Sequence, residues 1–194
     1  MKVLPLVLFM IFSGLSMNLM LQCGLGLSNA ASAKKKSKQL VLIQAGIIFT
    51  AVILLWVIFA KIISSIVSGI YIFVLLFPAS SLLYDSLESL TFRWLLKREM
   101  ENEFPVSFSS GITAAAAFIS LTAARGFIEA VALSFGFASG VLLAFLILGE
   151  IRLRASLEAV PRFLRGKPLT LISMGLLSLV FFRVSLLLFS MIGG

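Results

Sequence analysis

Residues 40–83 read "LVLIQAGIIFTAVILLWVIFAKIISSIVSGIYIFVLLFPASSLL", and Lys61 is the only charged residue among them. A helix that crosses a membrane needs about 20 mostly apolar residues. As one helix, these 44 residues would measure about 66 Å, twice the thickness of a bilayer core. We therefore expect the chain to fold back near Lys61–Ser65 and to cross the membrane twice here.

The rest of the chain has the same apolar character. Of its 194 residues, 60% are hydrophobic and 12% are charged, whereas soluble domains carry about 25% charged residues. Mean hydropathy is +1.14. We expect an all-α integral membrane protein with six spans and a single membrane domain over 1–194, since four further apolar runs cover Val3–Gln22, Val106–Ala124, Phe127–Gly149 and Leu169–Ile192.

Basic residues predict how the spans are oriented. Twelve of the 16 Lys and Arg residues fall after the first, third and fifth spans: Lys34, Lys35, Lys36, Lys38, Arg93, Lys97, Arg98, Arg152, Arg154, Arg162, Arg165 and Lys167. Cytoplasmic loops of membrane proteins are enriched in Lys and Arg. Both termini are thus predicted to lie outside, and the net charge of +8 indicates membrane topology rather than binding to nucleic acid.

Two segments allow more than one interpretation. Ala31-Ser32-Ala33 could be the cleavage site of a signal peptide, but cleavage would put the lysines that follow it on the outer face, so we expect the first span to be retained. The apolar residues between Leu82 and Leu95 recur at helical spacing. They fit an amphipathic helix in the membrane interface and an extension of the third span equally well.

Six spans divide into two halves of three, and halves with an odd number of spans are inverted relative to each other. The predicted repeats cover about 1–83 and 106–194, joined by a connector over about 84–105. Small residues interrupt the first span of each half, as "CGLGLSNAA" (23–31) and "SSGITAAAA" (109–117). Such breaks mark candidate ion-path sites, here Gly24, Gly26, Ser28, Gly111 and Thr113. The alternative is that small residues only let helices pack closely, as expected for "GFASG" at 136–140.

The C-terminal third carries a resemblance to a known family. Phe135–Phe181 includes Phe-Gly at 135–136, Ile-Arg-x-Arg at 151–154, Val-Pro at 160–161 and Arg-Gly at 165–166. This stretch resembles the last two spans of the Rnf/Nqr membrane-subunit family, the paired six-span subunits of ion-pumping electron-transport complexes. Weaker agreement elsewhere includes Asn18 and Ile112-Thr113.

The resemblance implies a bacterial or archaeal cytoplasmic membrane, a homologous six-span partner of opposite topology and other Rnf/Nqr-like subunits. In the family, two cysteines from each of the paired subunits hold a [2Fe–2S] cluster. The matching positions here are Ser28 and Ala116, and Cys23 lies five residues before the first. Because neither serine nor alanine offers a thiolate, we expect no metal, no cofactor and at most a non-catalytic role in an ion-translocating oxidoreductase.

Three ionisable residues within or beside the spans are further candidates for an ion path: Glu129, Glu150 and Arg183. Each also has an ordinary explanation, since carboxylates are common at membrane boundaries and a long Arg side chain can reach toward the interface. Two other functions fit the same sequence. The chain could be a small stand-alone transporter with an inverted repeat, or a structural membrane anchor of an envelope assembly.

Overall fold

The computed structural model describes residues 3–22, 38–63, 71–96, 107–157, 161 and 167–193. Every element in this part of the chain is helical. The first helix has three pieces: α1 (Val3–Ile11), a π-helical segment η1 (Phe12–Ser16) and α2 (Leu19–Gln22). The others are α4 (Lys38–Ile58) with η2 (Phe59–Ile63), α6 (Tyr71–Thr91) with η3 (Phe92–Leu96), α7 (Ser107–Ala123), α8 (Phe127–Leu157) and α9 (Lys167–Gly193).

Within the described ranges, three helices are long and apolar enough to cross a membrane: Val41–Ile62, Phe127–Ile151 and Pro168–Leu187. Two shorter apolar helices cover Leu6–Leu21 and Gly111–Ala123. This chain is therefore an all-helical protein of a kind compatible with a membrane, and the count of six spans stays a prediction.

The predicted fold-back within residues 40–83 is confirmed. The helix that begins at Lys38 ends at Ile63, the next begins at Tyr71, and α4 packs against α6. α6 then runs unbroken to Thr91, past the residues for which an interfacial helix and an extension of the third span fitted equally well. η3 continues the helix to Leu96, so these residues follow α6 in one helical segment, and where that segment lies relative to the membrane stays a prediction.

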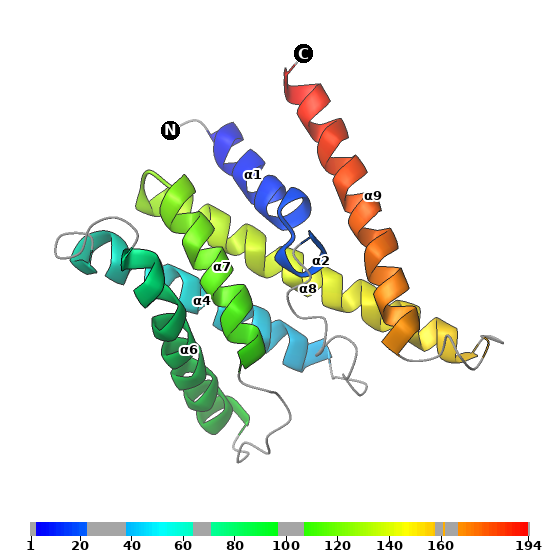
Figure 1. Cartoon of the computed structure of the whole chain (residues 1–194), viewed down its shortest axis with the longest axis horizontal. Coiled ribbons are helices and arrows are strands. Elements are labelled where there is room, and N and C mark those ends of the chain that lie inside the picture. Colours follow the sequence, from blue (N-terminus) through cyan, green and yellow to red (C-terminus); the bar gives the residue numbers. More distant parts are fainter. Residues whose placement is uncertain are drawn as a thin grey trace.

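α8 is the central helix (Figure 1), and it packs against α1, η1, α2, α4, α7 and α9. Its direction relative to α4 follows from two aromatic contacts, Phe49 with Phe135 and Trp56 with Phe127, each with ring centroids 6.1 Å apart. Residue numbers rise on α4 as they fall on α8, so the two helices are antiparallel. In Figure 1 successive long helices alternate in direction, and the start of α1 and the end of α9 lie at the same end of the molecule.

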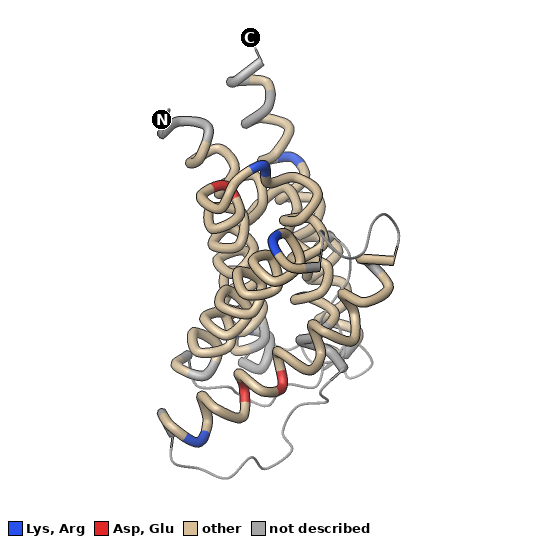
Figure 2. Tube along the Cα trace, turned by 90° about the vertical axis from the view of Figure 1, so that its left-hand side faces the viewer, with Lys and Arg blue, Asp and Glu red and all other residues tan. Residues whose placement is uncertain are grey.

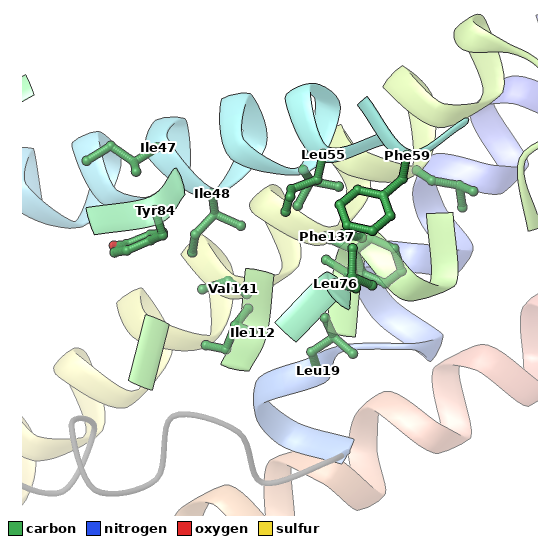
Figure 3. Close-up of a cluster of buried hydrophobic side chains, with 14 residues drawn as sticks. Leu19, Ile47, Ile48, Leu55, Phe59, Leu76, Tyr84, Ile112, Phe137 and Val141 are labelled. Carbon is green, nitrogen blue, oxygen red and sulfur yellow. The ribbon is translucent and has the colours of Figure 1, made fainter. Parts of the chain in front are cut away.

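Two clusters of buried apolar side chains hold the helices together. The larger joins α4, α6, α7 and α8 with Leu19 of α2 (Figure 3), and its labelled members include Leu19, Leu76, Ile112, Phe137 and Val141. The smaller joins α2, α8 and α9 through Met20, Leu148, Met174 and Phe181. Both clusters include residues of α2, so the short piece of the first helix ties the two parts of the core together.

Candidate functional site

The first helix is broken at Met17 and Asn18, between η1 and α2. The Asn18 side chain is almost completely buried and closes this break. Its Nδ2 donates to the Gly140 carbonyl at 2.8 Å and to the Gly14 carbonyl at 3.2 Å, while its Oδ1 accepts from the N–H groups of Met20 and Leu21, both at 3.2 Å. One amide thus caps α2 and links the break to α8, 122 residues later in the chain.

Close backbone contact surrounds the break. A Cβ at Gly14 would lie 2.9 Å from the Gly136 carbonyl oxygen, and one at Gly140 would lie 2.9 Å from the Cα of Gly14. A Cβ at Gly136 would collide with Ser13 Oγ and with the Met10 carbonyl oxygen. The interpretation of "GFASG" as a packing motif is therefore confirmed, because these glycines let α8 touch the backbone of the first helix.

The predicted break in the second half is wrong for the described residues. α7 is a continuous α-helix from Ser107 to Ala123, through the whole of "SSGITAAAA". Gly111 meets no atom that would demand a glycine, and the alanines that follow it have the highest helix propensity of any residue. Small residues here support a regular helix instead of interrupting it.

The residues proposed on α7 are nevertheless buried in the core. Thr113 and Ala116 are fully buried, and Ala116 belongs to the same apolar cluster as Leu19 and Ile112. The other candidates of the first half, Gly24, Gly26 and Ser28, lie outside the described residues, as do Cys23 and the rest of "CGLGLSNAA".

Two of the three candidate membrane charges have local structural roles. Glu129 lies in the first turn of α8, where its Oε2 accepts from the N–H of Arg125 at 2.8 Å. A carboxylate at this position also opposes the positive end of the helix dipole. Glu150 forms an exposed i,i+4 ion pair with Arg154, with Nε and Oε1 3.3 Å apart. Arg183 is exposed on α9, and no described carboxylate pairs with it.

Sequence reasoning missed Glu88, which is only 4% exposed on α6. It continues a line of buried residues spaced by four, after Leu76, Ser80 and Tyr84. That spacing is the signal that could have found it, because residues four apart share one face of a helix. One turn away, Asp85 Oδ1 is shielded from solvent and has no hydrogen-bond partner.

No cluster of three or more His, Cys, Asp or Glu residues suited to a metal ion occurs in the described ranges. Figure 2 shows how few charged residues these ranges contain and how long the uncharged stretches between them are. No protein-family model matches the chain, and no curated protein matches it. The resemblance to the Rnf/Nqr family therefore stays a hypothesis that rests on the residues themselves.

Proposed function

We propose that this chain is a membrane subunit of an Rnf/Nqr-type ion-translocating electron-transport complex, or of a derived relative. In this proposal the chain crosses the bacterial or archaeal cytoplasmic membrane six times, as two inverted three-helix repeats. Its role is structural or part of an ion path, and electron transfer does not pass through it. The observation that carries the proposal is the pattern of contacts between the two halves.

An inverted repeat would make the first helix equivalent to α7, α4 to α8, and α6 to α9. Contacts then have to occur in matching pairs, and most of them do. The contact of the first helix with α8 matches the contact of α7 with α4. The contact of α6 with α7 matches that of α9 with η1 and α2. The contact of α4 with α6 matches that of α8 with α9. The direct contact of α7 with α8 is an addition to this pattern, and it accompanies the short turn at 124–126.

Helix directions support the same arrangement. Equivalent helices of an inverted repeat run in opposite directions, and α4 and α8 are antiparallel. α1 and α8 run in the same direction, because Met10 lies at Gly136 and Asn18 bonds to Gly140. The break in the first helix, with its buried Asn18 amide, resembles the discontinuous helices that form ion sites in such folds.

A role without electron transfer is proposed from the residue types at the expected cluster positions. Ala116 presents only a methyl group, and it packs among apolar side chains. The hydroxyl of Ser28 is not the soft sulfur ligand that iron–sulfur clusters use. A subunit that retains the scaffold without these ligands would serve a complex as a membrane framework.

Purification from native membranes tests the proposal. The tagged full-length chain is extracted in mild detergent, and its partners are identified by mass spectrometry. We expect a homologous six-span subunit together with flavin- or iron–sulfur-bearing subunits. A homodimer that carries solute across liposomes would instead establish a stand-alone transporter, and envelope proteins without redox subunits would establish an anchor.

The absence of a redox role has a separate test. The chain is expressed without partners and purified, and its iron content and low-temperature EPR spectrum are measured. We expect no stoichiometric iron and no [2Fe–2S] signal, because Ser28 and Ala116 supply no thiolate. A stoichiometric [2Fe–2S] signal would overturn this part of the proposal.

A further inference from the structure

α9 is the least covered of the three long apolar helices. Only 28% of the most apolar stretch of α9 is buried inside the molecule, against 50% and 56% for the corresponding stretches of the helices that contain α4 and α8. One face of α9 packs on the rest of the molecule through Thr170, Met174, Phe181 and Ser185. The remaining surface of α9 faces away from the bundle.

The opposite face of α9 carries a regular seam. Ile172, Leu176, Leu179, Arg183 and Leu186 are all exposed, and they follow one another at spacings of four, three, four and three residues. That alternation is the a/d pattern by which two helices pack as a coiled coil. We call these five residues the outer seam of α9. Gly175 borders it, with open space where a Cβ would be.

Arg183 lies deep in the apolar part of α9. Arg183 is the one charged residue in the apolar run from Leu169 to Ile192. Its Cα lies about 4 Å along the helix axis from the middle of that run. The contacts between helices agree, because α9 packs on η1. η1 is the middle of the first apolar run, from Val3 to Gln22.

A guanidinium at this depth is costly unless it is paired. Insertion scales give about 2.5–3.5 kcal/mol for an Arg at the centre of a membrane helix, and such residues normally face the protein interior and pair with other groups. Arg183 faces away from its own bundle instead. The outer seam therefore has the character of an internal surface of a larger assembly.

We propose that the outer seam of α9 docks against a membrane-spanning helix of a different subunit, and that this helix presents an Asp or Glu carboxylate to Arg183. A single polar residue in an apolar seam fixes which helix binds and in which register. The inference rests on the proposed function only in requiring an assembly of several membrane subunits.

Lipid and a second copy of this chain fit the outer seam of α9 less well than a helix of a different subunit. Lipid phosphates lie at the membrane boundary, about 15 Å from the midplane. Among the described carboxylates, Glu88 is buried, Glu129 and Glu150 have partners within α8 or beside it, and Asp85 is half-buried on α6. A second copy thus presents no described carboxylate that is exposed, unpaired and in an apolar seam.

Photo-crosslinking tests the seam in the full-length chain in native membranes. A benzophenone side chain is placed at Leu179 in the seam, and in a matched control at Leu177, which is partly buried in the second core cluster. We expect the Leu179 probe to join one defined protein, within a membrane-spanning segment that contains Asp or Glu. The Leu177 probe should react only within its own chain.

Charge variants then test the pairing. Arg183→Glu and Arg183→Leu should lower recovery of that crosslinked protein at least about tenfold, because removing one member of a buried charge pair costs well over one tenfold step. Arg183→Lys should retain it. Arg125→Gln, at the exposed turn before α8, is the control and should change nothing. Reversing the partner's acid to Arg should restore recovery with Arg183→Glu.

Three results would overturn the inference: crosslinks from Leu179 to lipid alone, crosslinks to a second copy, or recovery unaffected by Arg183→Glu. The crosslink in the wild-type background does not depend on the folding of any Arg183 variant. Failure of the proposed function can be distinguished from failure of this inference. A partner unlike Rnf/Nqr subunits that still shows the charge dependence refutes the function alone, whereas Rnf/Nqr-like partners with a lipid-only crosslink refute the inference alone.

Discussion

The Asn18 side chain bonds to three backbone groups at the break in the first helix and to the Gly140 carbonyl on α8. A helix interruption exposes carbonyl and N–H groups, and each unpaired group in an apolar interior is expensive. Asn carries both an acceptor and donors on one short side chain, so a single residue can cap α2 and reach α8. The resemblance drew attention to Asn18, but only the folded chain shows what its amide does.

Asn18→Ala should destabilise the protein, because it removes the link to the Gly140 carbonyl and leaves the N–H groups of Met20 and Leu21 without their cap. The expected loss is about 1–3 kcal/mol, measured as free energy of unfolding in detergent. Thr50→Ala is the matched control. The Thr50 hydroxyl bonds only to carbonyls of its own helix and is exposed, so its removal should cost little. Equal losses in both variants would refute a bridging role.

At the scale of the element, the central helix α8 distinguishes two kinds of glycine. Gly136 and Gly140 lie one turn apart against the first helix, whereas Gly149 is exposed with no atom near its missing Cβ. Close helix contacts of this kind depend on small residues. The sequence analysis predicted the packing role of the first two, because both belong to a run of small residues within an apolar span.

Gly140→Ala should push the first helix away from α8, since the added methyl would meet the Gly14 backbone. Overpacking of this kind costs about 1–3 kcal/mol. Gly149→Ala, on the same helix, should be neutral or stabilising by up to about 1 kcal/mol through helix propensity. Thermal unfolding of the two purified variants in one detergent measures the difference. Similar melting temperatures would contradict the contact.

For the whole molecule, the predicted topology states on which side of the membrane each helix end lies. Lys61 and Arg125 lie at helix ends predicted to be outside, and Glu150 lies at one predicted to be inside. The alternating helix directions in Figure 1 are compatible with this arrangement. All three residues lie in the exposed or partly exposed part of the described chain, so cysteines at these positions can be reached by a reagent.

In a Cys23→Ser background, which removes the natural cysteine, Lys61→Cys and Arg125→Cys should react with a membrane-impermeant maleimide in intact cells. Glu150→Cys should react only after permeabilisation. The physical reason is the excess of Lys and Arg on the predicted cytoplasmic side. Labelling is measured by the mass shift of the protein on a gel. The reverse pattern would show the opposite orientation.

The length and position of apolar runs could be read from the sequence because they are local properties. The helix that ends near Lys61, the helical class and the close packing at Gly136 and Gly140 all followed from them. Where residues were judged singly, prediction failed. "SSGITAAAA" forms a continuous helix where a break was predicted, and the sequence analysis did not single out Glu88, which is buried on α6.

The helical, apolar and membrane-compatible character of this chain follows from its local sequence, because burying apolar side chains and pairing backbone groups within a helix are requirements of each segment alone. The packing of the helices sets where the first helix breaks, which carbonyl Asn18 reaches across 122 residues, and which seam of α9 stays uncovered. Those features depend on which helix lies against which. Contacts between segments distant in the chain, and not the pattern within any one segment, fix them.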